Sequence, residues 1–405
     1  MTETFKPADA AQLREVVAWA AAEEIPLDLA GSGTKRGYGR PVQARHAVDL
    51  SAISGISAYE PEELILTAAA ATPMAEIEAA IAAKGQMLAF EPVDLSGLLG
   101  GPAGGGTIGG ALSCGISGPR RVKAGAARDH LLGFHAVSGR GEIFKAGSKV
   151  VKNVTGYDLP KIFCGSLGTL GAMTEVTVKV LPAPPKARTV LLFGLDVASG
   201  VRAMTDALNS PFEVSGAAML PAAIAARSGI DMVRAAGASV VALRIEGTPA
   251  SVAARCAGLR ALLAGRAPDE ELHSMRSRRL WVEIRDVGAL LPDPAAALWR
   301  VSVPPAAAPA LAAALPGDWF LDWGGGLIWI AVPPGPEAEA TRIRGAIDAA
   351  AAGGHATLLR APASLRAGID VFHPQQPALA RLSARVKESF DPKRILNPGR
   401  LYAGV

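Results

Sequence analysis

Glycines gather in three short stretches of the 405-residue chain: residues 30–35 (AGSGTK), 105–110 (GGTIGG) and 165–171 (GSLGTLG). Glycine loses much conformational freedom on folding, so such clusters need a physical reason. Apolar residues such as Ile108 stand between the glycines, which favours ordered loops over a flexible linker. Backbone N–H groups that no Cβ shields form a cradle for anions, most often a diphosphate. Lys35 in the first loop could pair with such a group or lie solvated at the loop edge.

The common nucleotide motifs do not explain these loops. Residues 104–109 match G-x-G-x-x-G, and Asp129 follows twenty residues on, but the preceding residues 92–103 are rich in Gly and Pro and form no strand. The first loop does follow a strand, yet Arg36 stands where a third glycine belongs, and no G-x-x-x-x-G-K-[ST] exists. Three separate loops in one domain instead suggest a long ligand threaded between two subdomains.

A second set of residues could perform acid–base chemistry or bind a carboxylate. Histidine can act as a general base and arginine can anchor a carboxylate, and a salt-bridged or loop-end role is the alternative for each candidate. These candidates are Arg120, Arg121, His355, Arg360 and His373.

Metal chemistry is not expected. Cys114, Cys164 and Cys256 are far apart and form no C-x-x-C pair, so the sequence predicts no iron–sulfur cluster, no structural zinc and no bound metal. An odd number of cysteines also disfavours a disulfide framework and fits a reducing compartment.

The glycine loops must be positioned by regular elements. A helix over residues 10–22 is capped by Asp9, and a strand over 26–30 leads into the first loop. The proline-rich segment 181–186 (LPAPPK) ends this domain, because proline cannot continue a sheet ladder. Beyond it, strands alternate with alanine-rich helices, which indicates an α+β sheet with helices on one face, and we find no repeat of fixed period. The expected domains are 1–183, 184–374 and a C-terminal helix and tail, 375–405, that returns to the first domain.

Composition and charge exclude several classes of protein. Half of the residues are apolar, and 41 Lys+Arg against 37 Asp+Glu give a net charge of +4, so a nucleic-acid surface is not expected. No leader pattern and no 18-residue apolar stretch is found. We expect a cytoplasmic protein that reaches the inner face of the inner membrane, where it does so, only through partners.

In this order, the three loops and the tail 390–399 (FDPKRILNPG) resemble the FAD-binding domain of the vanillyl-alcohol-oxidase (PCMH) type. Residues 117–121, 124–129, 151–158, 323–326 and 354–360 are similar to the E subunit of bacterial glycolate oxidase, and they disfavour the enolpyruvyl reductase of cell-wall synthesis. The resemblance implies an α+β fold: a two-subdomain FAD domain, then a ferredoxin-like cap domain with an antiparallel sheet and helices.

The resemblance also implies the cofactor and its contacts. No histidine stands in residues 31–34, where relatives with covalent flavin commonly carry one, so FAD is expected to be non-covalent. The implied FAD-binding residues are Ala30, Gly31, Ser32, Gly33, Thr34, Lys35, Gly105, Gly106, Thr107, Ile108, Gly109, Gly110, Ser113, Gly115, Ser117, Gly118, Asp129, Gly165, Gly168, Gly171 and Asn397.

Catalytic relatives carry H-x-G-D-G-N-x-H in the second domain and a later E-H-G segment. Here residues 322–329 read DWGGGLIW, so both histidines are replaced, by Asp322 and Trp329, and no Glu-His pair follows. Two hypotheses remain for this FAD-dependent oxidoreductase of 2-hydroxy acids. It is either a relay subunit of a glycolate oxidase complex, beside a D-type catalytic flavoprotein and an iron–sulfur subunit, or an autonomous FAD-dependent 2-hydroxy acid dehydrogenase.

Overall fold

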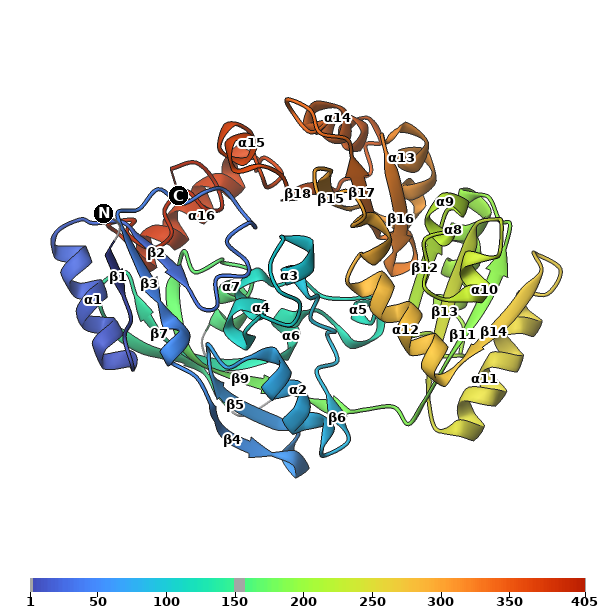
Figure 1. The fold of residues 1–405 in the computed structure, drawn as a ribbon, viewed down its shortest axis with the longest axis horizontal. Coiled ribbons are helices and arrows are strands. Elements are labelled where there is room, and N and C mark those ends of the chain that lie inside the picture. Colours follow the sequence, from blue (N-terminus) through green and yellow to red (C-terminus); the bar gives the residue numbers. More distant parts are fainter. Residues whose placement is uncertain (1–2, 149–156, 405) are drawn as a thin grey trace. The chain divides into compact units, whose positions relative to one another are not determined.

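The computed structural model describes residues 3–148 and 157–404, which form two compact units (Figure 1). Unit 1 comprises Met1–Ser117, Ala126–Ala183 and Arg366–Val405, and unit 2 comprises Gly118–Gly125 and Pro184–Leu365. The break at residue 183 falls within the proline-rich segment. Two boundaries differ from the expected ones: residues 118–125 join unit 2 and residues 366–374 join unit 1. Of the family-like stretch 151–158, residues 151–156 lie outside the described residues.

The first half of unit 1 is a small parallel sheet covered by one helix. Strands β1 and β2 both pair with β3 in parallel. Asp9 caps α1 as predicted, because its side chain accepts a hydrogen bond from the Gln12 N–H at 2.9 Å. Leu13 and Val17 of α1 pack on Leu27 of β2 in a fully buried cluster. The elements are β1 (Glu3–Phe5), α1 (Ala10–Ala22), β2 (Leu27–Ala30) and β3 (His46–Asp49).

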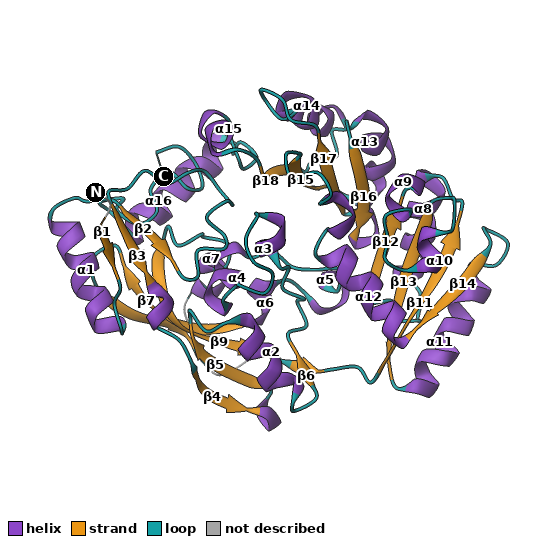
Figure 2. Ribbon diagram, viewed as in Figure 1, coloured by secondary structure: helices purple, strands orange, loops and turns teal. Residues whose placement is uncertain are grey.

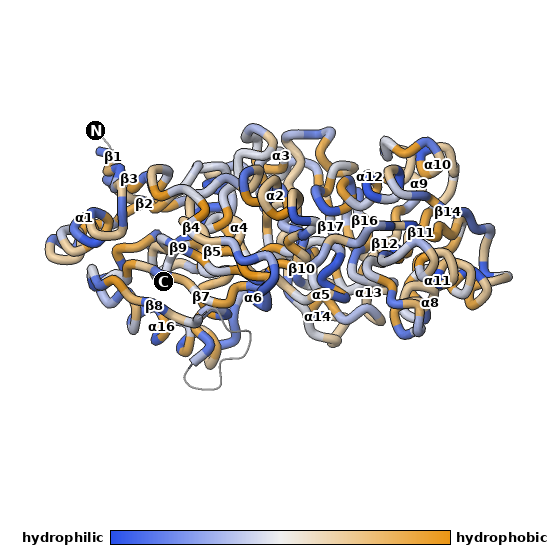
Figure 3. The backbone as a smooth tube through the Cα atoms, turned by 90° about the horizontal axis from the view of Figure 1, so that it is seen from below, coloured by the Kyte–Doolittle hydropathy of each residue, from blue (hydrophilic) through white to orange (hydrophobic). Residues whose placement is uncertain are grey.

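The second half of unit 1 is a five-stranded antiparallel sheet of order β4-β5-β9-β7-β8. Helices α2, α4 and α7 bury Ile77, Leu112 and Phe163 in a core with residues of β5, β7 and β9. Hydrophobic residues of these strands are coloured orange in Figure 3. The elements are β4 (Ile56–Glu60), β5 (Ile65–Ala69), α2 (Met74–Ala82), β6 (Gln86–Met87), α3 (Leu95–Leu98), α4 (Ile108–Cys114), α6 (Ala127–His130), β7 (Leu131–Ser138), β8 (Ile143–Gly147), α7 (Leu159–Phe163), β9 (Gly171–Lys179) and β10 (Leu181–Pro182).

The C-terminal segment returns to unit 1 through α15 (Ala363–Gly368), which spans the boundary, and α16 (Pro377–Phe390). Lys387 is 1% exposed, and its ammonium donates to Asp391 (2.6 Å) and to the carbonyls of Thr169 (2.7 Å) and Leu396 (2.9 Å). A buried charge is tolerated only when it is paired and hydrogen-bonded, as here. The hydrogen bond from Lys387 to the Thr169 carbonyl joins the tail to the third glycine loop.

Unit 2 is one eight-stranded sheet of order β14-β11-β13-β12-β16-β17-β15-β18, antiparallel throughout (Figure 2). Its elements are α5 (Arg121–Ala124), β11 (Lys186–Phe193), α8 (Val197–Leu208), β12 (Gly216–Leu220), α9 (Ala222–Ala225), α10 (Asp231–Arg234), β13 (Val240–Gly247), α11 (Pro249–Leu262), β14 (Asp269–His273), α12 (Ser274–Arg285), β15 (Ala297–Ser302), α13 (Ala308–Ala314), β16 (Asp318–Asp322), β17 (Leu327–Val332), α14 (Ala340–Ala349) and β18 (His355–Arg360).

The order of these elements reveals a repeat. Strands β11 to β14 with α8 and α11 form one ferredoxin-like βαββαβ unit, and β15 to β18 with α13 and α14 form a second. These two repeats join within the sheet of unit 2, where Met219 of β12 pairs with Leu321 of β16. The α+β class and its ferredoxin-like sheet are confirmed, but the repeat was missed because its insertions leave no fixed period.

Helices also cover both faces of the first repeat, against the expectation of one. On one face, α8 lies against Met219 and Val241. On the opposite face, Trp281 of α12 lies against Gly216 and donates a hydrogen bond to Thr189 of β11 at 2.9 Å. Within the described residues, no helix is long and apolar enough to cross a membrane.

Candidate functional site

A cavity that is partly open to solvent lies within unit 1, where the first loop, the third loop and the C-terminal tail meet α4. Its wall combines small and apolar residues with polar and cationic ones. The lining residues are Leu29, Ala30, Gly31, Ser32, Gly33, Thr34, Lys35, Arg36, Leu50, Ala70, Ala71, Thr107, Gly109, Gly110, Ser113, Cys114, Leu167, Gly168, Gly171, Ala172, Met173, Asn397 and Arg400.

The first loop presents free backbone donors to this cavity. It begins where β2 ends, and it turns through Gly33, whose φ of +76° favours glycine. The Arg36 N–H donates to the Gly33 carbonyl at 3.2 Å, which closes the turn. Among the hydrogen bonds of the described residues, none uses the N–H groups of residues 32–35. Four consecutive N–H groups without a partner, on residues that line a cavity, suit the binding of an anion.

The second loop supports the first from behind. Thr107 caps α4, accepting from the Gly110 N–H at 3.2 Å, and a Cβ on Gly110 would lie 3.6 Å from the Lys35 ammonium. The Gly109 N–H donates to the carbonyl of Ala70 at 2.8 Å, and a Cβ there would lie 2.6 Å from that oxygen. Gly109 is therefore required both by close packing on the sheet and by its place on the cavity wall.

The third loop and the tail are joined by Asn397, whose side chain makes two buried hydrogen bonds. Its Oδ1 accepts from the Leu29 N–H at 2.8 Å, and its Nδ2 donates to the Leu167 carbonyl at 2.8 Å. A Cβ on Gly168 (φ +73°) would lie 2.9 Å from the same amide nitrogen. Asn397 thus links the end of β2 to the third loop and fixes two walls of the cavity.

Two cations in the lining were missed by sequence reasoning, Arg36 and Arg400. Arg36 is half-exposed and pairs with Asp28 at 3.2 Å. Arg400 is 6% exposed; its Nη2 donates to the Lys35 carbonyl at 2.9 Å, while its Nε has no hydrogen-bond partner among the described residues. The Asn-Pro-Gly-Arg run of the tail was a signal that could have indicated Arg400.

The apolar part of the cavity raises the pKa of a thiol. Cys114 is 8% exposed, and burial raises its pKa, against the opposing charges of Lys35 and Arg400. These charges mark the end of the cavity to which the first loop and the tail contribute. Leu29, Leu50, Ala70, Ala172 and Met173 supply an apolar remainder.

Thirteen of the predicted cofactor residues line this cavity: Ala30, Gly31, Ser32, Gly33, Thr34, Lys35, Thr107, Gly109, Gly110, Ser113, Gly168, Gly171 and Asn397. The others lie outside its lining, and for most of them the structure shows another role. Ile108 is fully buried in the sheet core, and the Ser117 hydroxyl accepts from the Ala127 N–H. A Cβ on Gly115 would lie 3.1 Å from the backbone of Gly165, so these two segments pack closely. Asp129 accepts a hydrogen bond from the Ala126 N–H.

The remaining predicted cofactor residues lie nearby in sequence. A Cβ on Gly105 or Gly106 would meet Thr34 at 3.0 Å or the Lys35 ammonium at 2.8 Å, so both support the first loop. Gly118 belongs to unit 2, where its carbonyl accepts from the Trp323 indole at 3.1 Å.

The candidate catalytic residues are engaged in structural contacts. Arg120 forms a bidentate ion pair with Glu246, at 3.0 and 2.9 Å. Arg121 lies over the Trp323 ring, 4.2 Å from its centroid, and Arg300 lies 4.9 Å from the same centroid. These contacts attach residues 118–125 to the sheet of unit 2.

The other three candidates are divided between the two units. Arg360 donates to the carbonyls of Ala296 (3.0 Å) and Asp293 (2.7 Å), and burial lowers its pKa. His355 is exposed at the start of β18, whereas Arg360 is at its end, about 16 Å away at the usual rise of a strand. His373 lies in unit 1, and its backbone carbonyl accepts from the Tyr402 hydroxyl at 3.5 Å.

Residues 322 and 329, where the resemblance implies histidines in catalytic relatives, are buried here. Asp322 is 2% exposed and accepts from the Trp323 N–H at 2.7 Å, and Trp329 is 2% exposed within β17. Among the described residues there is no group of three His, Cys, Asp or Glu that could hold a metal ion. In this part of the chain, Arg120 and Arg360, which could anchor a carboxylate, are held by Glu246 and by a backbone carbonyl.

The cavity fits a dinucleotide. The N–H groups of the first loop and the cations Lys35 and Arg400 suit a diphosphate, and the Arg400 Nε, which has no partner among the described residues, needs an acceptor. The apolar walls suit a flat ring system. Residues 3–147 match the FAD binding domain family. The fold matches that of p-cresol methylhydroxylase with a TM-score of 0.72 at 16% identity, over 98% of this chain and 88% of that one. The fold is therefore that of p-cresol methylhydroxylase, and its first part matches an FAD binding domain.

Sequence comparison narrows this class. The chain is 34% identical to glycolate oxidase subunit GlcE of Escherichia coli (strain K12), over 96% of this chain and 97% of that protein. It is 28% identical to glycolate oxidase subunit GlcD of Bacillus subtilis (strain 168), over 49% of this chain and 41% of that one. The chain belongs to the GlcE family of FAD-binding, PCMH-type oxidoreductase subunits.

Proposed function

We propose that this chain is the FAD-binding subunit of a glycolate oxidase complex that oxidises glycolate to glyoxylate. Its FAD is held non-covalently in the cavity of unit 1 and accepts and donates electrons between the other subunits. The GlcE similarity along almost the whole chain supports the complex. The observation that carries the proposal is a contrast: the cavity of unit 1 has the donors and cations that a dinucleotide needs, while Arg120 and Arg360 are engaged in structural contacts.

The residues of the chain have separate tasks in this proposal. The first loop offers its N–H groups to the diphosphate, Asn397 holds the surrounding loops, and the apolar wall excludes water from the adenosine half. When bound, FAD supplies reversible transfer of one or two electrons. A D-type catalytic flavoprotein would remove the hydride from substrate, and an iron–sulfur subunit would accept the electrons.

The side chains that line the cavity support non-covalent attachment. No histidine or tyrosine lines the cavity in the described part of the chain, and its one thiol, Cys114, has a pKa raised by burial. A neutral thiol is a poor nucleophile. The proposal therefore needs no bond between chain and flavin.

The test is copurification from the native host with a count of flavin and iron per complex. We expect about one FAD per copy of this chain, released into the supernatant on acid precipitation, together with a second flavoprotein and iron. A colourless chain, or flavin that remains on the precipitated protein, would contradict the cofactor assignment or its non-covalent state. A chain that purifies alone and turns over glycolate would support the autonomous dehydrogenase instead.

A further inference from the structure

We propose that Arg400 is a direct ligand of the FAD diphosphate, so that the C-terminal tail and the first glycine loop together neutralise its two negative charges. This inference rests on the proposed cofactor. It assigns a binding role to a residue 365 positions away in sequence from the loop that it completes.

The first step is the unsatisfied donor. Arg400 is 6% exposed and lines the cavity, and its Nε has no hydrogen-bond partner among the described residues. A buried charged donor without an acceptor is costly, and buried polar groups in folded proteins are nearly always satisfied. An anionic ligand in the cavity would supply the missing acceptor.

A hydrogen bond within the protein orients the Arg400 side chain. The Arg400 Nη2 donates to the carbonyl of Lys35, so the guanidinium lies against the same loop whose residues line the cavity. Arg40 donates its backbone N–H to the Arg400 carbonyl at 2.9 Å, which fixes the backbone from the other side. The guanidinium is therefore held in place before any ligand binds.

The last step is the balance of charge. A diphosphate diester carries two negative charges. Of the three cations in the lining, Arg36 is paired with Asp28, whereas no ion pair within 4.0 Å involves Lys35 or Arg400 in the described residues. Lys35 and Arg400 thus match the ligand charge for charge, and Arg400 adds the directed hydrogen bonds that a guanidinium gives to phosphate.

The experiment compares ligands that differ only in phosphate. Binding of FAD, ADP and adenosine to the full-length apoprotein is measured by flavin fluorescence and by competition with FAD, for wild type, Arg400→Gln and Arg400→Lys. We expect Arg400→Gln to weaken FAD and ADP by about 10- to 100-fold and adenosine by less than about 2-fold. Arg400→Lys should fall between, and wild-type affinity for ADP should depend more steeply on salt than that of Arg400→Gln.

Arg394→Gln is the matched control, because Arg394 lies on the same tail, is exposed and donates to the Gly404 carbonyl outside the cavity. An unchanged ADP affinity in Arg400→Gln overturns the inference. An equal loss for ADP and adenosine also overturns it, since that pattern marks a purely structural role. If Arg400→Gln does not fold, the Arg400→Lys ratio of ADP to adenosine affinity decides. If wild type binds no FAD, the proposed cofactor fails first and this inference with it.

Discussion

At the scale of single residues, the glycines of this chain have different physical reasons, and the structure separates them. Gly109 packs its Cα against the backbone of Ala70, whereas a Cβ on Gly97 would meet nothing within 4 Å. Both have ordinary negative φ and both lie in the glycine-rich segment 97–118. The pair therefore tests close packing without a difference in backbone strain.

We predict that Gly109→Ala lowers stability by about 1–3 kcal/mol, because its methyl group would lie 2.6 Å from the Ala70 oxygen and force the loop and sheet apart. Flavin occupancy should fall with it, since Gly109 also lines the cavity. Gly97→Ala should leave both quantities nearly unchanged. Thermal unfolding of the apoprotein and the flavin-to-protein absorbance ratio measure the two effects. Equal behaviour of both variants would show that Gly109 is not under packing constraint.

A second residue-scale prediction concerns Cys114, which lines the cavity while Cys256 is fully buried in unit 2. Bound FAD should slow alkylation of Cys114 at least ~10-fold relative to the apoprotein. Because burial raises the pKa of Cys114, labelling of the apoprotein should keep rising above pH 9 as the reactive thiolate forms. Peptide mass spectrometry after N-ethylmaleimide measures this, with Cys256 as the unlabelled reference. Labelling that ignores FAD would place the cofactor elsewhere.

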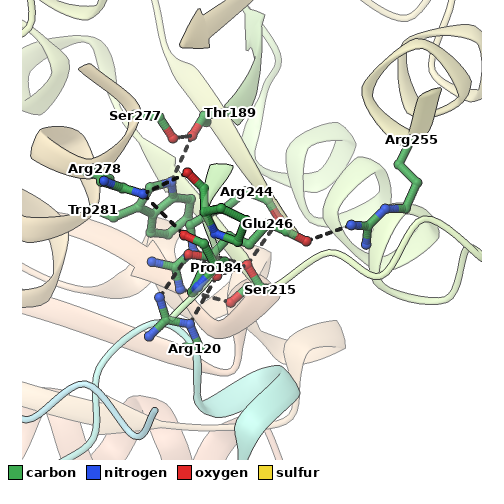
Figure 4. A network of polar contacts seen from close by, with 11 residues as sticks. Arg120, Pro184, Thr189, Ser215, Arg244, Glu246, Arg255, Ser277, Arg278 and Trp281 are labelled. Carbon is green, nitrogen blue, oxygen red and sulfur yellow. Dashed lines mark hydrogen bonds and ion pairs between the residues drawn. The ribbon is translucent and has the colours of Figure 1, made fainter. Parts of the chain in front are cut away.

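At the scale of elements, a carboxylate near the end of β13, Glu246, forms a network of polar contacts within unit 2 (Figure 4). Glu246 accepts from Arg120 and from the Ser215 hydroxyl (2.6 Å), and it lies 3.4 Å from Arg244. Burial alone would raise its pKa, but Arg244, Arg120 and Ser215 outweigh this and lower it from 4.5 to about 2. This network joins the N-terminal end of α5 to strands β12 and β13.

The lowered pKa gives a signed pH dependence. The stabilisation by Glu246 is fully present above pH 4.5, its ordinary value, and is lost as the pH falls toward 2. Glu246→Gln should cost about 3 kcal/mol at pH 7, because it leaves buried arginines without a countercharge, and it should flatten the acid dependence of unfolding. Glu213→Gln is the control: Glu213 pairs with Lys123 and Arg255 at the surface, and its loss should cost below about 1 kcal/mol. An unchanged acid slope in Glu246→Gln would argue against the assigned pKa.

The sequence predicted elements where a local signal was strong and missed them where the cause is tertiary. Asp9 and the spacing of Leu13 and Val17 predicted α1 to the residue, since capping and helical periodicity are local. Short strands such as β12 (Gly216–Leu220, GAAML) were not predicted, because five buried residues in a row, with no polar residue among them, carry no alternation. Arg400 was missed for a similar reason: its place in the cavity depends on a tail that returns across the whole chain.

At the scale of the whole molecule, neither unit is a single stretch of chain. Unit 1 needs residues from both ends, and unit 2 includes residues 118–125, which continue directly from the segment that lines the cavity. Sequence alone divided the chain at residue 183, where prolines mark the break, but contacts such as Arg120 with Glu246 join residues 126 positions apart and leave no local trace. The fold of each unit thus depends on contacts between residues that are far apart in the sequence.

The last prediction follows from the absence of a histidine pair at residues 322 and 329. The isolated subunit, fully loaded with FAD, should not reduce an artificial acceptor with glycolate or lactate as substrate. Hydride transfer to flavin requires removal of the hydroxyl proton and an anchored carboxylate, and a positioned base contributes about 10²–10⁴-fold to the rate. Asp322 and Trp329 replace the histidine pair and are buried in structural contacts, while Arg120 and Arg360 are held by Glu246 and by backbone carbonyls.

Coexpression with a D-type flavoprotein and an iron–sulfur subunit should restore dye reduction, because electrons then have a source and an exit. Steady-state dye reduction by the single chain is compared with that of the reconstituted complex, at equal flavin content. A control complex that carries Arg400→Gln in this subunit should lose flavin and turnover together, which links the cavity to electron flow. Turnover of the single chain at a rate comparable to the complex would show that it has its own substrate site, and His355, Arg360 and His373 would then be the first residues to replace.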